Sequence, residues 1–327
     1  MTILVTGAAG FIGMHVAETL LAGGRRVVGV DNLNPYYDVE LKKDRLKRLQ
    51  AFENFTFYEL DIADRAALYA ALGAHPEISL VVHLAAQAGV RHSLTHPFDY
   101  ASSNLTGFLT ILEFCRQLKK LKHFVYASSS SVYGANTDMP FSVDQVTDQP
   151  LSLYAATKKA NEVMAYSYAH LYGLPMTGLR FFTVYGPWGR PDMAYWRFVE
   201  RIMKGEPVQI YNNGDMRRDF TYIDDVVKGI LEVLAHPPEK PGGGAAHKVY
   251  NLGNNKAEKL LDFVAIIEKT LGKKAERQFL PMQPGDVKET FADIDSIHRD
   301  VGYEPATSLA EGLPKFVKWY LEYFSKD

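Results

Sequence analysis

The first half of the chain alternates short apolar runs with stretches of helical periodicity. Apolar positions that recur every three to four residues predict helices at Phe11–Ala22, Tyr100–Lys119 and Leu153–Tyr172. The runs between them predict strands, at Ile3–Thr6, Val27–Asp31, Phe55–Glu59, Leu80–His83, Phe124–Ala127 and Met176–Phe181. Strands that alternate with helices predict βαβ units with right-handed crossovers, and near-continuous apolar strands are typical of a parallel sheet covered on both faces. The pattern therefore indicates an α/β fold around a doubly wound parallel sheet.

After Phe182 the periodicity loosens, and turn signals become frequent. They occur at Gly186–Gly189, Asn212–Gly214 and Pro237–Gly244. A chain of 327 residues is long enough for two domains. We expect a larger sheet domain at residues 1–181 and a smaller, mainly substrate-binding domain at residues 182–327, with some segments of the second half returning to the first domain.

Composition and charge narrow the class of protein. The hydrophobic content of 47% and the charged content of 23% are those of an ordinary globular protein. A net charge of −2 provides no broad basic field, which argues against nucleic acid or an acidic membrane as the main partner. The single Cys115 excludes an intramolecular disulfide and fits a reducing compartment. With no apolar run long enough for a bilayer and no leader-like start, a cytoplasmic protein is expected.

A glycine-rich turn follows the first predicted strand and opens the first predicted helix. Gly7 permits the tight turn, Gly10 lets a pyrophosphate approach the backbone, and Gly13 lets helix and strand pack closely. Asp31 ends the second strand 18 residues beyond Gly13, where a carboxylate accepts from the adenosine ribose and repels a 2′-phosphate. These features predict a Rossmann-type site for NAD rather than NADP. The alternative is a glycine turn without a ligand.

Further residues at the carboxyl ends of the strands are expected to line the same groove. They comprise the start of the first helix, the neighbour of Asp31 and the segments after the third and fourth strands, namely Phe11, Ile12, Asn32, Asp61, Ile62, Leu84, Ala85, Ala86 and Gln87. Asp61 could meet the adenine amine. The small side chains of Ala85 and Ala86 would let the backbone approach the cofactor.

Tyr154 and Lys158 are four residues apart in the helix predicted at Leu153–Tyr172. This spacing sets a phenol and an ammonium on one helix face, about one turn apart. Lowering the pKa of a phenol from ~10 to ~7 needs about 4 kcal/mol, which a cation at about 4 Å supplies when the effective dielectric is near ~20. Tyr154 could therefore donate and accept a proton. With 19 tyrosines and 21 lysines in 327 residues, about one such pair arises by chance, so a surface pair is the alternative.

Four serines, Ser128–Ser131, follow the fifth predicted strand. They belong at the same sheet edge as the glycine turn, because carboxyl ends of parallel strands share one edge. Ser152 is a candidate N-cap for the helix that carries Tyr154. Glycine loop, strand-end serine and Tyr-x-x-x-Lys helix should therefore meet.

In this order, the motifs resemble those of the extended short-chain dehydrogenase/reductase family, over nearly the whole chain. Within that family the chain is most similar to the epimerases that act on UDP-glucuronate. The longer stretches that carry the resemblance are Asn34–Asp38, Pro150–Lys159, Arg180–Ala194, Arg217–Tyr222 and Met282–Val287.

The resemblance implies an enzyme with tightly bound NAD that converts UDP-glucuronate to UDP-galacturonate through a transient 4-keto sugar. It implies that Ser129 is the catalytic serine and that Tyr154 acts as base and acid. It implies that Lys158 binds the nicotinamide ribose and lowers the pKa of Tyr154. Family members usually dimerise through the helices that match Tyr100–Lys119 and Leu153–Tyr172, so a homodimer is implied as well.

UDP is expected, by the same resemblance, on the second domain. Arg218 matches the diphosphate-binding arginine, since a planar cation suits a phosphate. Asp286 matches a position near the uridine ribose, and the segment with Gln209 and Tyr211 could pair the uracil. Met193 lies in the Arg180–Ala194 motif and is expected beside the substrate. Arg91 could reach the sugar or phosphates, or form a surface salt bridge.

The expected 4-keto uronic acid is a β-keto acid that readily loses carbon dioxide. Loss needs the C5–carboxyl bond roughly perpendicular to the ketone plane, so an epimerase must hold the carboxylate elsewhere. Candidate hydrogen-bond donors are Ser130, Ser131, Thr183 and Arg190. Related galactose epimerases usually carry Asn where Thr183 stands, which points away from a neutral hydroxymethyl. Arg190 could instead grip the diphosphate or cap its own turn.

Several features favour plainer interpretations. His92 and His96 have the spacing of a zinc pair but lack the glutamate of the usual motif, so no metal is expected. The charge run at Lys42–Arg48 is expected to be a solvated helix face, with closure over the cofactor as a minor alternative. Sugar-nucleotide 4,6-dehydratases of the family carry Asp-Glu where Ser129 and Ser130 stand, so dehydration lacks its acid and base.

Three functions remain open on these residues. The first is epimerisation of UDP-glucuronate. The second is UDP-glucuronate decarboxylation or epimerisation of a neutral UDP-hexose. The third, of a different class, is a catalytically silent NAD-binding protein, against which the intact set of Ser129, Tyr154 and Lys158 argues.

Overall fold

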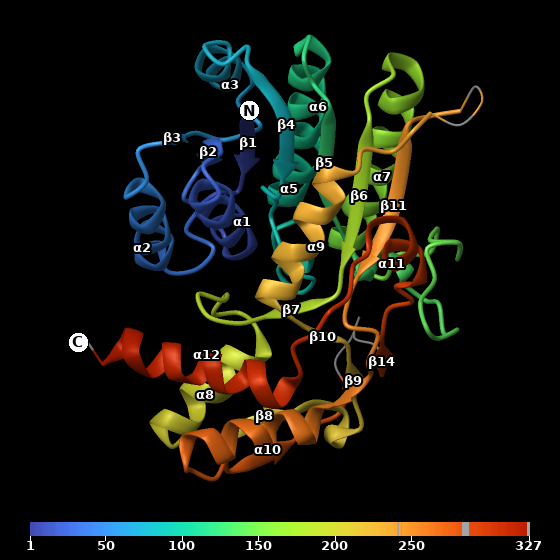
Figure 1. Ribbon diagram of the computed structural model, residues 1–327. Helices are drawn as coiled ribbons and strands as arrows, with labels where there is room; N and C mark the ends of the chain where they lie inside the picture. The colour runs from blue at the N-terminus through green and yellow to red at the C-terminus, as the bar shows by residue number, and fades with distance from the viewer. Residues whose placement is uncertain (241, 243, 283–287, 326–327) are drawn as a thin grey trace.

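Seven parallel strands form the large sheet of the computed structural model, which describes residues 1–240, 242, 244–282 and 288–325 (Figure 1). Their order across the sheet is β11-β6-β5-β4-β1-β2-β3. The strands are β1 (Thr2–Thr6), β2 (Arg26–Asp31), β3 (Phe55–Glu59), β4 (Ile78–His83), β5 (His123–Ser129), β6 (Met176–Phe181) and β11 (His247–Leu252). The strand order reverses between β1 and β4, which is the point where open α/β sheets bind ligands.

The predicted strands and the doubly wound sheet are confirmed. Along the central strands, alternating residues enter two separate cores, as the period of two requires. In β1, for example, Ile3 and Val5 belong to one core and Leu4 to the other. Because both cores are apolar, the sheet is covered on both faces.

Helices cover the two faces of the sheet in separate groups. The face with Ile3 and Val5 carries α1 (Phe11–Ala22) and α9 (Ile223–Ala235), which pack against each other, with α2 (Val39–Gln50) beside α1. The opposite face carries α3 (Arg65–Leu72), α6 (Gly107–Gln117) and α7 (Leu153–Tyr172).

The helix predicted at Tyr100–Lys119 forms with an irregular start. It consists of α5 (Pro97–Tyr100), the π-helical turn η1 (Ala101–Thr106) and α6. A π-helical turn is rare and is frequently found at functional sites. Cys115, which lies in this stretch, is buried.

The second region lies beyond the carboxyl edge of the large sheet (Figure 1). Its strands pair in three small sheets: β7 (Thr183–Tyr185) with β10 (Phe220–Tyr222), β8 (Val208–Ile210) with β13 (Arg277–Phe279), and β9 (Arg217–Arg218) with β12 (Glu258–Lys259) and β14 (Glu289–Thr290). Its helices are α8 (Ala194–Lys204), α10 (Leu260–Leu271) and α12 (Leu309–Phe324). Short helices complete the chain at α4 (His92–Thr95), η2 (Ser130–Tyr133) and η3 (Tyr211–Gly214).

Three elements from beyond residue 182 lie with the large sheet. Strand β11 pairs with β6, α9 packs against α1, and α11 (Asp295–Val301) packs against β11. The domain boundary near residue 181 stays a prediction.

Helix α2 differs from its expected role as a solvated face. Lys43, Lys47 and Arg48 are exposed, but Lys42 and Arg45 are buried. The prediction was wrong for these two residues, because the 188–189 turn lies over Arg45, and Lys42 lies over the Tyr37 ring at the cavity wall.

None of the helices in the described part of the chain is long and apolar enough to span a membrane.

Candidate active site

A cavity of about 850 Å³ lies between the carboxyl edge of the large sheet and the second region. This volume is within the usual range for ligand pockets. Every residue named from the sequence for cofactor, catalysis or substrate lines it, except Asp286, which lies outside the described residues: Gly7, Gly10, Phe11, Ile12, Gly13, Asp31, Asn32, Asp61, Ile62, Leu84, Ala85, Ala86, Gln87, Arg91, Ser129, Ser130, Ser131, Tyr154, Lys158, Thr183, Arg190, Met193, Gln209, Tyr211 and Arg218.

The glycine turn has no room for side chains. Gly7 has φ +73°, and a Cβ there would lie 2.8 Å from the backbone nitrogen of Ala85. A Cβ on Gly13 would lie 2.0 Å from the Gly7 carbonyl oxygen. Gly10 is the N-cap of α1 and offers no side chain to its first N–H groups, which suits a diphosphate. The turn therefore fits a dinucleotide.

Asp31 joins this turn to the loop after β2. Its carboxylate accepts hydrogen bonds from the backbone nitrogens of Ala9, at 3.1 Å, and Leu33, at 2.9 Å. Asp61 accepts from the side chain of Asn32 at 3.0 Å. Two strand ends are thus tied together where an adenosine ribose is expected.

The helix that carries Tyr154 and Lys158 begins as predicted. Ser152 is its N-cap and accepts from the backbone nitrogen of Ala155 at 3.1 Å. Lys158 is buried, and its Nζ donates to the Ala127 carbonyl of β5 at 2.8 Å. Burial lowers the pKa of Lys158 to about 8.

The pKa of Tyr154 is raised, because burial disfavours the phenolate more than a hydrogen bond with Ser129 and the charge of Arg190 favour it. Lys158 is not among the groups that lower it, since its ammonium is held at Ala127. The expectation that Lys158 lowers the pKa of Tyr154 in the NAD-bound enzyme stays a prediction.

Asn104, in the π-helical turn, was not identified from the sequence. Its amide accepts from the Gln87 backbone nitrogen at 2.8 Å and donates to the Gln87 carbonyl at 3.0 Å. It also donates to the Thr157 hydroxyl at 3.0 Å. Asn104 thus links the segment after β4 to α7. Nothing in the sequence singled it out, because its neighbours Ser102, Ser103 and Thr106 are polar as well.

A buried ion pair between Glu162 and Arg180 holds α7, the helix of Tyr154 and Lys158, against the sheet. Glu162, one turn after Lys158, accepts from Nε and Nη2 of Arg180 at 2.8 and 2.9 Å. The Ser128 hydroxyl donates to Glu162 at 2.7 Å. Although burial opposes it, Arg180 holds the pKa of Glu162 below its ordinary value. The pair therefore joins α7 to β6 and to the strand end beside Ser129.

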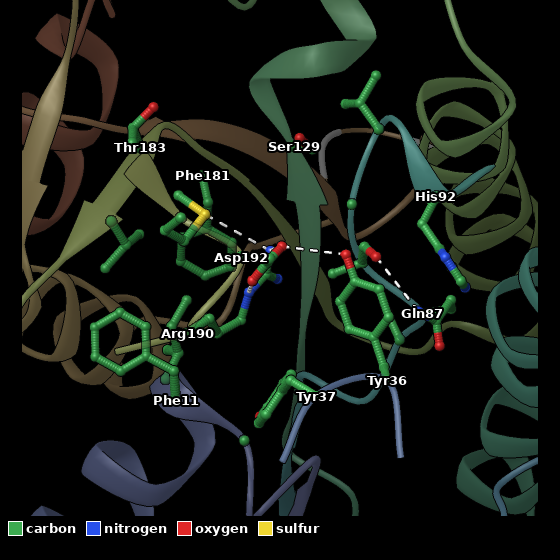
Figure 2. Close-up of a pocket in the computed structure, with 18 of the residues that line it drawn as sticks. Phe11, Tyr36, Tyr37, Gln87, His92, Ser129, Phe181, Thr183, Arg190 and Asp192 are labelled. Carbon is green, nitrogen blue, oxygen red and sulfur yellow. Dashed lines mark hydrogen bonds and ion pairs between the residues drawn. The ribbon is translucent and has the colours of Figure 1, made fainter. Parts of the chain in front are cut away.

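Arg190 enters the cavity already paired. Its Nη2 and Nε lie 2.7 and 3.0 Å from the Asp192 carboxylate, which also accepts from the Tyr36 hydroxyl at 3.2 Å (Figure 2). Against the effect of burial, Arg190 keeps the pKa of Asp192 low, whereas burial and Asp192 raise that of Tyr36 to about 12. Tyr36 and Asp192 stood in motifs of the sequence but had no assigned role.

The far end of the cavity carries cations and aromatic groups. Arg218 donates to the carbonyls of Arg217 and Lys288, at 2.9 and 3.0 Å. Arg91 lies over the Tyr211 ring, 5.4 Å from its centroid. Tyr211 donates to the Gln209 side chain at 3.0 Å.

His92 and His96 stack with ring centroids 4.0 Å apart. The described residues contain no group of three or more His, Cys, Asp or Glu side chains that could hold a metal ion.

Comparison with known proteins agrees with this geometry. The model of the NAD dependent epimerase/dehydratase family matches residues 3–253. The chain belongs to this family. It is 50% identical to Protein CapI of Staphylococcus aureus over the full length of both chains. It is 49% identical to UDP-glucuronate 4-epimerase 4 of Arabidopsis thaliana, over 100% of this chain and 77% of that protein.

Among solved structures, UDP-glucuronic acid 4-epimerase from Bacillus cereus, in complex with UDP-glucuronic acid and NAD, superposes with a TM-score of 0.88. The two chains are 36% identical, with 99% of this chain and 100% of that chain covered. As a member of the epimerase/dehydratase family, the chain has a cavity suited to NAD at the glycine turn and a phenol, a hydroxyl and an ammonium beyond it. These three groups can bind a proton and transfer it.

Proposed function

We propose that this protein is an NAD-dependent UDP-glucuronate 4-epimerase that interconverts UDP-glucuronate and UDP-galacturonate. The single observation that carries the proposal is the cavity that brings Ser129, Tyr154 and Lys158 together with the hydroxyl groups of Ser130, Ser131 and Thr183. The similarity to proteins named for this reaction supports it.

Tyr154 is proposed as the proton acceptor and donor. Bound NAD supplies the site that takes the C4 hydrogen as hydride and gives it back. The Tyr154 oxygen takes the proton of the sugar 4-hydroxyl and later returns it, while Ser129 orients that hydroxyl. Because burial raises the pKa of Tyr154, a positive charge near the phenol is needed for it to act as a base at neutral pH.

The carboxylate of the substrate is proposed to lie against Ser130, Ser131 and Thr183. Arg190 is less suited to bind the substrate carboxylate, because its Nε and Nη2 already donate to the carboxylate of Asp192. Three hydroxyl donors are therefore the better candidates for holding the carboxylate away from the geometry that loses carbon dioxide. Arg190 is then proposed to act near Tyr154, whose pKa it lowers.

The UDP group is proposed to lie toward the second region. Arg218 would bind the diphosphate, Gln209 and Tyr211 would meet the uracil, and Arg91 and Met193 would border the sugar. Asp286 is proposed at the uridine ribose on the resemblance alone.

We further propose a cytoplasmic homodimer. Helices α6 and α7 expose large apolar side chains, among them Leu109 at 42%, Val163 at 60% and Tyr166 at 54%. Such a face is typical of a protein interface. Light scattering on the wild type and on Val163→Glu tests this, because a dimer through this face should become monomeric in the variant.

The test of the reaction is incubation of the purified protein with UDP-glucuronate and no added NAD. UDP-galacturonate supports the proposal, while UDP-xylose or its 4-epimer indicates a decarboxylase. If only neutral UDP-hexoses turn over, the protein is a hexose epimerase. No turnover of any UDP-sugar indicates a silent NAD-binding protein.

The role of Thr183 is tested separately. Thr183→Ala should release carbon dioxide and UDP-pentose during turnover, because one carboxylate donor is lost. A hydrogen bond to a charged group is worth about 1.5–3 kcal/mol, so the partition should shift by at least about tenfold. Thr183→Ser keeps the hydroxyl and serves as control. Unchanged epimerisation without decarboxylation in Thr183→Ala would count against this assignment.

A further inference from the structure

Arg45 is a fully buried arginine whose hydrogen bonds all go to loops. Its Nε and Nη2 donate to the Trp188 carbonyl at 3.1 and 2.6 Å, and Nη2 also donates to the Gly189 carbonyl at 2.7 Å. Its Nη1 donates to the Ala9 carbonyl at 3.2 Å and to the Tyr37 hydroxyl at 2.7 Å. All five guanidinium N–H groups are thus used.

The acceptors belong to three segments that wall the cofactor end of the cavity. Ala9 lies within the glycine turn, Tyr37 follows Tyr36 in the loop after β2, and the 187–189 turn leads into Arg190 and Asp192. Arg45 itself lies behind this wall, since it is not among the residues that line the cavity. The Arg45 side chain therefore links three segments of the cavity wall.

The 187–189 turn has further anchors. His15 of α1 lies 3.0 Å from the Pro187 carbonyl, and burial lowers the pKa of His15 to about 4, so a neutral ring donates this bond. The Trp188 ring packs against Trp319 of α12, with centroids 5.2 Å apart, and Trp188 has φ +61°. Three successive carbonyls, of residues 187 to 189, are thus bound by α1 and α2.

The charge of Arg45 fits an anion at the glycine turn. Among the described residues, none of the ion pairs includes Arg45. A buried cation is favourable only with compensating negative charge. A dinucleotide would bring its diphosphate to the glycine turn, whose Ala9 carbonyl Arg45 binds.

We propose that Arg45 is a positioning residue that keeps the cofactor cavity closed, so that NAD stays on the protein from one turnover to the next. The inference rests on the proposed function in one respect: a redox-neutral epimerisation is completed only if the reduced cofactor stays until the keto sugar takes the hydride back. Arg45 links the glycine turn, the Tyr37 loop and the 187–189 turn to α2. These hydrogen bonds resist the separation of the three segments that would let NAD leave.

The experiment measures NAD exchange on the holoenzyme, with no UDP-sugar present. Protein purified with its NAD is mixed with an excess of deuterium-labelled NAD, and the bound unlabelled fraction is followed by mass spectrometry. Arg45→Met, which keeps the length but removes the charge and the donors, should exchange at least about tenfold faster than wild type. Arg45→Lys should lie between the two, because it keeps the charge without the planar fork.

Lys43→Met is the matched control, because Lys43 lies on the same helix, is exposed and pairs with Glu40 only at the surface. It should exchange at the wild-type rate. With saturating added NAD, Arg45→Met should recover turnover to within about threefold of wild type, since the fault lies in retention rather than chemistry. Exchange at the wild-type rate in Arg45→Met, or turnover that added NAD does not restore, overturns the proposal.

If Arg45→Met does not fold, the exchange rate of the Tyr37→Phe variant tests the proposal instead. It removes one acceptor and leaves the guanidinium in place, so exchange should rise about threefold. An unchanged rate in that variant then overturns the proposal. Exchange is measured without UDP-sugar, so its result does not depend on epimerase activity. A protein without epimerase activity would refute the proposed function, while faster NAD exchange in Arg45→Met would still support the role of Arg45.

Discussion

Removing the carboxylate of Glu162 should destabilise the protein strongly. In Glu162→Ala, Arg180 keeps its place in β6 with only 4% of its side chain exposed, but loses both carboxylate contacts, at 2.8 and 2.9 Å. Leaving one charge of a buried pair without its partner costs about 3–5 kcal/mol. Ser128 also loses its acceptor, which adds about 1 kcal/mol.

Urea unfolding followed by tryptophan fluorescence measures this loss, since Trp188, Trp196 and Trp319 lie in or near the second region. Lys159→Met is the matched control: Lys159 also pairs with Glu162, at 3.4 Å, but 32% of its side chain is exposed, so its loss should cost less than about 1 kcal/mol. The double variant Glu162→Met, Arg180→Met should recover much of the stability, because no unpaired charge remains.

The pH dependence gives an independent check. Because the folded protein holds the pKa of Glu162 below its ordinary value, the stabilisation is present above that value and is lost as the pH falls through the folded pKa. The deficit of Glu162→Ala should therefore shrink in acid. A single variant within about 1 kcal/mol of wild type, or a double variant no more stable than the single, would refute the reasoning.

Three further predictions concern the active site and its support. Tyr154→Phe should lose turnover by at least about a hundredfold while keeping its NAD, and turnover near the wild-type rate would contradict the proton-transfer role. Gly13→Ala should lose NAD binding, because its Cβ would lie 2.0 Å from a backbone oxygen, whereas Gly23→Ala, with 3.4 Å to its nearest neighbour, should bind normally in equilibrium dialysis. Burial raises the pKa of Asp219 to about 6, so ionisation opposes folding as the pH rises. Wild type should therefore gain about 1 kcal/mol in unfolding free energy from pH 7 to pH 5. Asp219→Asn should lack this gain, and an equal gain would show that another group is responsible.

The local elements of the fold were predictable because each depends on a short stretch of chain. The strands at Phe55–Glu59 and Met176–Phe181 and the helices at Phe11–Ala22 and Leu153–Tyr172 have the predicted bounds. The glycine turn was predictable for the same reason, since its spacing alone sets the turn and the start of α1. The π-helical turn at Ala101–Thr106 was not, because its Asn104 bonds to Gln87 and Thr157, which other parts of the chain bring to it.

The sequence by itself determined the first six strands of the sheet, many residues of the cavity wall and the position of Tyr154 and Lys158 on one helix. Tertiary structure alone decided how charged groups are used. Lys158 turns to Ala127, Arg190 pairs with Asp192, and Arg45 is buried against Trp188, 143 residues away. A charge run looks the same in sequence whether its helix faces water or a loop, because burial depends on contacts that only the folded chain makes.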